Sequence, residues 1–443
     1  MATASQSSSA GDSRRFDLVL FGATGFVGGL TADELAAVAP AGMRIALAGR
    51  NQVKLDVAAR RCAANGTAVE TLIVDVERPH TTAAMAEAAK VVVSTVGPYT
   101  HYGLEVVRAC AQAGTDYADL TGEPLFVRES ILTFGSDANR SGARIVHSSG
   151  FDSVPSDLLV WLLRDAARAD HEGSLTETTM VVRRVRGGFS GGTAASGLAH
   201  GRAMAADPVA RRHAQDPYTH SDRRNEEPEL GRQPDGRLVA LRTIDDGLRG
   251  WAGGFFMGPH NTRVVRRSNT LTDWSYGRRF KYSEVMAVPG GPLSLLPASI
   301  MAGGLSMMPL AGLIKYVPEL VTDAILPASG SGPNAKSRAK GHFTFETYTR
   351  TTTGARYRAT FAMTGDPGYA ATAVILAQVG LALALDGERL STFGGVLTPA
   401  VALGDALIPR LRAMGVRLDV ERLSGSETAA GPAYNKEEEQ VIG

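Results

Sequence analysis

Short apolar runs and helical stretches alternate through the first third of the chain. Residues 16–22 form an apolar run typical of a buried parallel strand, and residues 31–38 continue as a helical stretch. Further strand candidates, separated by helical stretches, lie at 44–50, 71–75, 90–96, 116–123 and 143–155. Strands that alternate with helices in this way predict βαβ units and a doubly wound parallel sheet.

The pattern changes near residue 175. Runs rich in Thr, Tyr, Phe and Val now predict strands, at 176–185, 264–270, 276–285, 342–351 and 355–364. They suit a second, α+β domain with a mostly antiparallel sheet that closes over the crevice of the first sheet. Residues 369–385 are apolar on nearly all sides and predict a helix buried between domains. Residues 194–205 predict a helix of small residues, and 206–236 a long polar excursion.

A glycine-rich turn joins the first strand to the first helix. Its spacing is GxxGxxG, and its residues are Gly22, Ala23, Thr24, Gly25, Phe26, Val27 and Gly28. Small residues allow a tight turn and let a pyrophosphate approach the free backbone amides at the helix N-terminus. Glycine triplets arise by chance in a chain with 50 Gly, but here strand, turn and helix stand in the required order. The turn therefore predicts a Rossmann-type dinucleotide site.

The end of the second strand bears on the choice of cofactor. NAD sites usually place Asp or Glu there to hold the ribose 2′-hydroxyl, whereas this chain has Arg50 and Asn51, with Lys54 one turn on. A guanidinium suits a 2′-phosphate, so the pattern favours NADPH, and a solvated surface charge is the alternative. Asp75 is expected at the adenine end, and Gly97 and Pro98 near the nicotinamide.

These patterns predict an α/β protein of two domains with two tails. The expected divisions are a disordered tail at 1–15, an NADP-binding domain at 16–165 and a substrate or dimerisation domain at 166–365. C-terminal helices at 366–423 are expected to pack back on the NADP-binding domain, and a second disordered tail follows at 424–443.

The amino-acid composition argues against several classes of function. Forty-six Lys and Arg against 45 Asp and Glu give a net charge of +1, which argues against nucleic acid as the main partner. Two Cys, outside any CxxC pair, and nine scattered His without HExxH predict no metal site. The first residues lack the apolar core of a secretory signal, so we expect a cytoplasmic protein.

One stretch of 30 residues, 285–314, carries no charge. It is long enough to span a membrane, but four prolines and five glycines fit a single regular helix poorly. A lipid-facing flap on the inner face of the plasma membrane and a buried helical hairpin or dimer contact remain as alternatives. Four of the twelve Met lie here, as suits an adaptable apolar surface.

Longer motifs occur in the order found in a known family. GATGFVG, AGRN, VGPYTHYG, TDYADLTGE and SGFDSVPSDL follow one another, and matching segments continue to about residue 420. The chain thereby resembles the saccharopine dehydrogenase-like oxidoreductases, and within them the actinobacterial trans-acting enoyl reductases of polyketide lipid assembly. None of the eleven tyrosines has Lys four residues later, so the YxxxK pair of short-chain dehydrogenases is absent.

The resemblance implies reduction of the α,β-double bond of an acyl chain carried on a polyketide synthase, with NADPH as hydride donor. Other readings are a relative that reduces a lipid carbonyl or imine, and a lipid-binding or scaffold protein stabilised by its nucleotide. Arginines of the second domain could meet a phosphopantetheine or acyl carrier surface, or lie on a solvated strand face. These are Arg183, Arg184, Arg263, Arg266 and Arg267.

The catalytic candidates lie after the strands that face the nicotinamide. Tyr99 and Tyr102 follow the fourth strand, and a phenol can donate both a proton and an oxyanion hydrogen bond. Packing over the nicotinamide or the sheet edge is the structural alternative for both. Asp152 precedes a helix, so it is a candidate acid or an N-cap.

Overall fold

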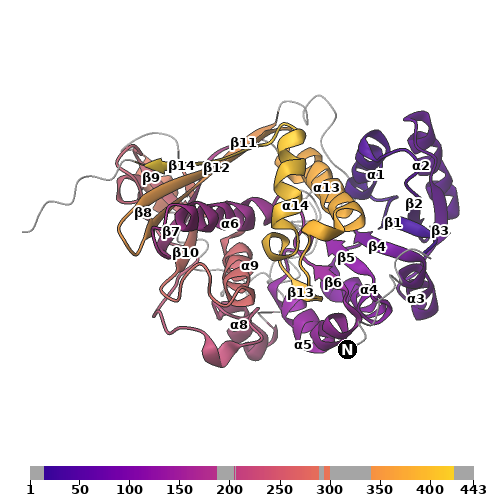
Figure 1. Ribbon diagram of the computed structural model, residues 1–443, viewed down its shortest axis with the longest axis horizontal. Coiled ribbons are helices and arrows are strands. Elements are labelled where there is room, and N and C mark those ends of the chain that lie inside the picture. Colours follow the sequence, from indigo (N-terminus) through magenta and orange to yellow (C-terminus); the bar gives the residue numbers. More distant parts are fainter. Residues whose placement is uncertain (1–13, 187–203, 205, 289–293, 300–340, 424–443) are drawn as a thin grey trace, which may run out of the picture.

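Two sheets lie side by side in the computed structural model, which describes residues 14–186, 204, 206–288, 294–299 and 341–423 (Figure 1). The first sheet is entirely parallel, in the order β13-β6-β5-β4-β1-β2-β3. Its strands are β1 (Phe16–Phe21), β2 (Ile45–Gly49), β3 (Glu70–Ile73), β4 (Ala89–Ser94), β5 (Asp116–Asp119), β6 (Arg144–Val146) and β13 (Gly395–Leu397). The predicted doubly wound sheet is confirmed.

Helices cover both faces of this sheet because side chains of β1 alternate between two apolar clusters. Leu18 and Leu20 point to the cluster under α1 (Phe26–Val38) and α2 (Gln52–Ala64). Val19 and Phe21 point to the opposite cluster, which is covered by α3 (Pro79–Ala88), α4 (Tyr99–Ala113) and α5 (Pro124–Ser141).

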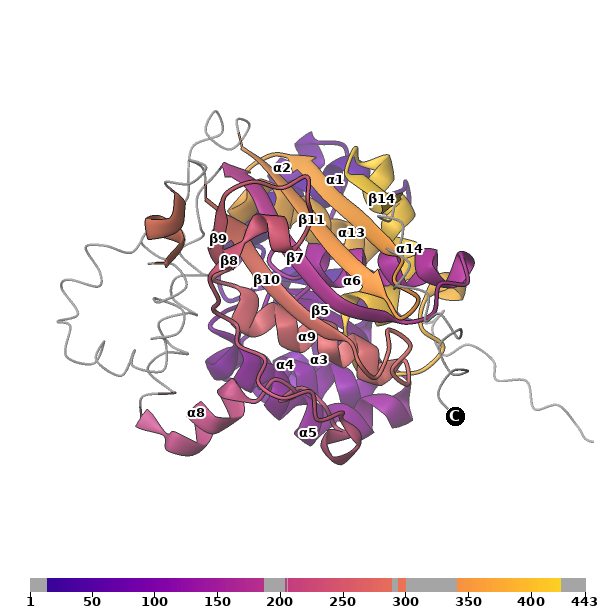
Figure 2. The same ribbon diagram turned by 90° about the vertical axis from the view of Figure 1, so that its left-hand side faces the viewer.

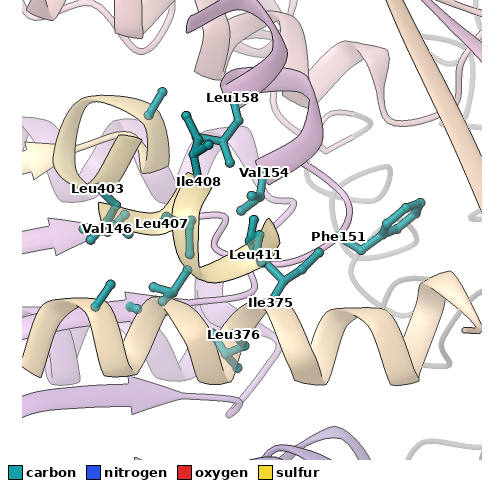
Figure 3. Packing of buried hydrophobic residues seen from close by; sticks show 14 of the residues in the cluster. Val146, Phe151, Val154, Leu158, Ile375, Leu376, Leu403, Leu407, Ile408 and Leu411 are labelled. Carbon is teal, nitrogen blue, oxygen red and sulfur yellow. The ribbon is translucent and has the colours of Figure 1, made fainter. Parts of the chain in front are cut away.

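The C-terminal part of the chain returns to the parallel sheet. A π-helical turn (Pro367–Ala371) leads into α13 (Thr372–Leu385), which packs against α1, β1 and β4. After a 3₁₀ turn (Gly387–Arg389), β13 pairs with β6, and α14 (Pro399–Ala413) follows. Figure 3 shows side chains of α14 packed among those of α13 and α6 (Val154–Ala169), among them Leu407, Leu411, Ile375 and Val154.

The second sheet is mixed, in the order β14-β12-β11-β7-β10-β9-β8. Its strands are β7 (Leu175–Arg186), β8 (Val239–Ala240), β9 (Trp251–Gly254), β10 (Lys281–Ala287), β11 (His342–Thr351), β12 (Arg356–Thr364) and β14 (Arg417–Leu423). Every neighbouring pair is antiparallel except β7 with β10. The mostly antiparallel sheet is therefore confirmed.

Two helices lie between the second sheet and the parallel sheet in Figure 1, and behind the second sheet in Figure 2. They are α6 and α9 (Gly258–Leu271), which contact each other and pack on the sheet through β11, β12 and β10. The strand expected at 264–270 was wrong, because α9 occupies these residues. Its residues from Thr262 to Asn269 are almost all buried, so tertiary contacts override the strand tendency of its Val and Thr.

The polar excursion after residue 206 is ordered against this helix and the first domain. Within residues 206–236 it contains α8 (Pro208–Gln215) and a 3₁₀ turn (Arg224–Glu226); another 3₁₀ turn (Leu241–Thr243) lies between β8 and β9. The two tails, residues 1–13 and 424–443, lie outside the described residues, as do most of the helix expected at 194–205 and most of the uncharged segment.

One described stretch, Pro367–Leu385, is long and apolar enough to cross a membrane by length and composition, and 72% of its most apolar window is buried within the protein. This stretch holds α13, and its apolar side chains fill the space between the parallel sheet and α14. Its hydrophobicity is thus used in the core.

Candidate functional site

The glycine-rich turn packs too tightly to accept larger residues at its ends. A Cβ on Gly28 would lie 2.2 Å from the Gly22 carbonyl oxygen and 2.8 Å from Oγ1 of Thr95. Gly22 has φ of +88°, and a Cβ there would lie 2.6 Å from the same Thr95 hydroxyl. The backbone of this turn can therefore lie closer to a ligand, as a pyrophosphate site requires.

The other residues of the turn divide between core and surface. Ala23 is buried, whereas Thr24 and Gly25 are exposed in front of the first turn of α1. Phe26 and Val27 are half-buried, and the Phe26 ring meets the edge of the Tyr369 ring at 4.8 Å. The C-terminal segment thus supports the turn from behind, and the helix N-terminus stays open for an anion.

The end of β2 carries positive charge without a competing carboxylate in the first turn of α2. Arg50 and Lys54 are exposed, and the Asn51 side chain caps α2 by accepting the amide of Lys54 at 3.0 Å. This arrangement fits a 2′-phosphate on the Arg50 guanidinium, with the cap fixing the backbone beside it.

The remaining predicted cofactor contacts flank the same edge of the sheet. Asp75 follows β3, and its carboxylate accepts the amide two residues on at 3.1 Å, so it shapes its own turn. Gly97 and Pro98 follow β4, directly after Val96, whose side chain would lie 2.8 Å from a Cβ on Gly22. The residues predicted to bind the cofactor therefore follow four neighbouring strands, β4, β1, β2 and β3, at one edge of the sheet, and their chemistry fits NADPH.

Tyr99 has a structural place in the fold. Its ring is 5% exposed, its hydroxyl donates to the Ser94 carbonyl at 3.2 Å, and it accepts the Leu120 amide at 3.1 Å. Burial, with the Asp119 charge nearby, raises the pKa of Tyr99 well above its ordinary value. A hydroxyl with both roles used by backbone, and reluctant to ionise, is poorly suited to donate a proton to substrate. These contacts favour the packing alternative for Tyr99 over a catalytic role.

Tyr102 lies on the first turn of α4 and is 39% exposed, with the exposed His101 ring 6.2 Å away. The start of α4 is held by Glu123, whose carboxylate accepts the amides of Tyr99 and Thr100 at 3.0 and 2.8 Å. Glu123 therefore caps the N-terminus of α4.

Sequence reasoning missed a buried polar network behind the loops that follow β5 and β6. Asp119 accepts from Nδ1 of His147 at 2.7 Å and from the Ser148 amide at 3.0 Å, and Nε2 of His147 meets the Ser130 hydroxyl at 2.8 Å. Ser148 takes a φ of +61°, rare for a residue with a side chain, and its hydroxyl lies 2.8 Å from Nε2 of His260. The only sequence signal was that Asp119, His147 and Ser148 lie at the ends of strands at the ligand-binding edge.

Asp152 lies on the loop between β6 and α6. Ser153 occupies the N-cap position of α6, so Asp152 is not the cap of that helix. Burial raises the pKa of Asp152 to about 6, and among the described residues no side chain donates to its carboxylate. Its carbonyl oxygen accepts the Asn261 side-chain amide at 2.6 Å, which ties the loop to α9.

The arginines of α9 do not form a docking surface. Arg263, Arg266 and Arg267 are 2–4% exposed. Arg267 donates to the Val396 carbonyl at 2.5 Å and to the His220 carbonyl, so it joins α9 to β13 and to the excursion. These three arginines do not make the acyl-carrier surface that the sequence suggested, because their guanidinium groups are buried and donate to groups inside the protein.

The two arginines of β7 remain nearer the surface. Arg183 pairs with Glu346 of β11 at 3.2 Å, and Arg184 is exposed. Among the described residues, no group of three or more His, Cys, Asp or Glu is placed to hold a metal ion.

Comparison with known proteins agrees with this site. Residues 18–146 match the family model of the saccharopine dehydrogenase NADP binding domain. A Mycobacterium tuberculosis protein with a provisional trans-acting enoyl reductase name is 53% identical over 416 residues, covering 93% of this chain and 99% of that protein. Trans-acting enoyl reductases of Mycobacterium bovis and Mycobacterium ulcerans are 48% and 46% identical over 420 and 419 residues, with the same coverage. Saccharopine dehydrogenase (L-Glu forming) of Saccharomyces cerevisiae shares the fold, with a TM-score of 0.53 at 13% identity, covering 92% of this chain and 99% of that one.

Proposed function

The chain belongs to the trans-acting enoyl reductase family, and we propose on this premise that it reduces the α,β-double bond of an acyl thioester with NADPH. The observation that carries the proposal is the 48–53% sequence identity, over nearly the full chain, with proteins of that name, together with an NADP-binding domain. The exposed Arg50 at the end of β2 supports NADPH over NADH.

The reaction divides into a hydride transfer and a proton transfer. The turn from Gly22 to Gly28 and the Arg50 side chain would hold NADPH, which would supply a hydride for the β-carbon while the electron pair of the double bond moved onto the thioester oxygen. The α-carbon then takes a proton, and we assign this proton to the Asp152 carboxyl, which water reprotonates after each turnover. A recessed carboxyl without a positive partner among the described residues keeps its proton at a higher pH than an ordinary Asp.

The test follows NADPH consumption with enoyl thioesters and measures the product mass. A gain of two hydrogens at the double bond supports the proposal. Reduction of a ketone or imine indicates the first alternative, and tight NADPH binding without turnover indicates a nucleotide-stabilised lipid-binding protein.

The role of Asp152 is tested with Asp152→Asn. We expect kcat to fall by about 10²–10⁴, the usual contribution of general acid catalysis, with the affinity for NADPH unchanged. Asp405→Asn is the matched control because Asp405 is an exposed carboxylate on α14. Equal kcat values for the two variants would remove Asp152 from the mechanism.

We also propose that the acyl chain arrives on an acyl carrier domain of a polyketide synthase and that the pathway makes a cell-envelope lipid. The reductase would then act in the cytoplasm. Addition of acyl carrier-bound enoyl substrates supports this when kcat/KM exceeds that of the same acyl group on a small thiol. Equal values would argue for free thioesters as substrates.

A contact with the inner face of the plasma membrane is proposed from the uncharged segment. Of its described residues, Leu295 and Leu296 are 42% and 70% exposed, whereas Ala298 is buried. Flotation with anionic liposomes should carry the protein upward, and Leu296→Lys should reduce the bound fraction. Recovery wholly in the soluble fraction at low and high salt would exclude membrane contact.

Light scattering then tests a homodimer, at twice the 46.6 kDa chain mass.

A further inference from the structure

The loop that carries Asp152 is held by the side chain of a residue in the second domain. Asn261 is fully buried in the first turn of α9. Its amide nitrogen donates to the Asp152 carbonyl at 2.6 Å, and its amide oxygen accepts the Ser153 hydroxyl at 2.8 Å. Two successive residues of the loop are therefore fixed by one side chain.

The orientation of this amide is set from the side of β10. Glu284 is 1% exposed, and its carboxylate accepts the Asn261 amide nitrogen at 3.0 Å and the Tyr282 hydroxyl at 2.9 Å. The Ser156 hydroxyl also lies 3.2 Å from the amide nitrogen. Acceptors thus surround the nitrogen, and the one hydroxyl donor faces the oxygen, so the amide has a single favourable orientation.

The neighbouring residue of α9 holds the other end of the same loop. Nε2 of His260 lies 2.8 Å from the Ser148 hydroxyl, in the residue whose φ is +61°. The first turn of α9 therefore contacts the loop at Ser148 and again at Asp152 and Ser153. A loop fixed at both ends presents its remaining side chains in one geometry.

We infer that Asn261 is a positioning residue for proton transfer, which holds Asp152 at the α-carbon through the hydrogen bond to its backbone carbonyl. The inference rests on the proposed function, in which Asp152 is the acid. Glu284 acts one step behind, because it fixes which end of the Asn261 amide faces the loop. Misplacement of a reacting group by about 1 Å can lower a rate by two orders of magnitude, so a loosened loop should slow the chemical step.

The test compares Asn261→Ser with Asn269→Ser. Asn269 is a matched control because it is a buried Asn on the same helix, and its side chain bonds to Tyr276 and Gly277, away from the loop. We expect Asn261→Ser to lower kcat at least tenfold with little change in KM, and to raise the solvent deuterium isotope effect on kcat. Asn269→Ser should lose stability and keep both kinetic values.

A double-mutant cycle shows whether Asn261 acts through Asp152. In the Asp152→Asn background, Asn261→Ser should cause no further loss of kcat, since the group that it positions is already gone. Multiplicative losses, or equal kcat for the two Asn variants, would overturn the inference.

A measurement without turnover separates this inference from the proposed function. Hydrogen exchange followed by mass spectrometry should show faster exchange in peptides covering residues 148–158 in Asn261→Ser, and unchanged exchange there in Asn269→Ser. Unchanged exchange in both would refute the contact as a restraint, even when the wild-type protein reduces enoyl thioesters. Failure of the wild-type protein to reduce any enoyl thioester would refute the proposed function and the assigned proton transfer. The exchange result would then still show whether Asn261 restrains the loop.

Discussion

Replacement of Tyr99 by Phe separates a packing role from a catalytic one. The change removes only the hydroxyl, which donates to the Ser94 carbonyl and accepts the Leu120 amide. Each such hydrogen bond contributes about 1 kcal/mol net, and a buried donor left without a partner costs about 1–3 kcal/mol. The free energy of unfolding should therefore fall by roughly 2–4 kcal/mol.

The catalytic consequence should be small by comparison. A general acid contributes about 10²–10⁴ in rate, whereas a packing residue that leaves the loops in place should change kcat less than about tenfold. Urea unfolding measures the stability and NADPH consumption measures kcat, each at a temperature where the variant is folded. Tyr102→Phe is the control for stability, because the Tyr102 side chain is 39% exposed and its loss should hardly change the urea midpoint. An unchanged midpoint for Tyr99→Phe, with a hundredfold loss of kcat, would refute the packing role.

Three further variants test the cofactor site and the core. Arg50→Ala should raise KM for NADPH by about 10–100-fold and leave KM for NADH unchanged, because a charge-assisted bond to the 2′-phosphate is worth about 1.5–3 kcal/mol; equal effects on both cofactors would contradict that assignment. Arg267→Met should lower the free energy of unfolding by about 2–6 kcal/mol, since it leaves two carbonyls in a buried site without their donor, at about 1–3 kcal/mol each, and urea unfolding measures this. Burial raises the pKa of Asp157 from 3.8 to about 6, so the folded protein holds a proton across this range that the unfolded chain has released. The stability that this group contributes is thus present at low pH and is lost as pH rises from about 4 to about 6, by up to about 1.4 kcal/mol per pH unit. Asp157→Asn should remove this loss from a series of urea midpoints measured between pH 4 and 7.

The elements with local signals could be predicted, and those made by distant contacts could not. The strand predicted at 342–351 coincides with β11, because the alternation of Phe343 and Phe345 with polar residues is a local signal for a strand. Residues 264–270 have the composition of a strand and form a helix, because the buried contacts of α9 outweigh a weak local tendency. A Gly-Pro pair at 258–259 was the available signal, since Pro is favoured in the first turn of a helix. The three-residue β13 has no such signal and exists through pairing with β6.

The residues of the candidate site also fall into those that the sequence could place and those that it could not. Backbone requirements are visible in sequence, so the turn from Gly22 to Gly28 and the charge at Arg50 could be placed by spacing alone. Burial is not visible, so Tyr99 and an exposed phenol such as Tyr102 had equal standing until their surroundings were known. Asn261 could not have been found at all, because it lies more than a hundred residues from the loop that it contacts.

Two polar contacts between α9 and α6 determine how far the second domain can move relative to the proposed catalytic loop. Asn261 meets Ser153 at the start of α6, and two turns further along α9 the Ser268 hydroxyl donates to Asp157 at 2.5 Å. Val265 lies between them on α9, fully buried in the core that both domains share. A tilt of α9 against α6 would break these buried hydrogen bonds at one end or the other and open the apolar contact between the two helices. Entry and release of substrate therefore require movement elsewhere than at the α6–α9 contact, and variation in acyl chain preference is expected in residues outside it.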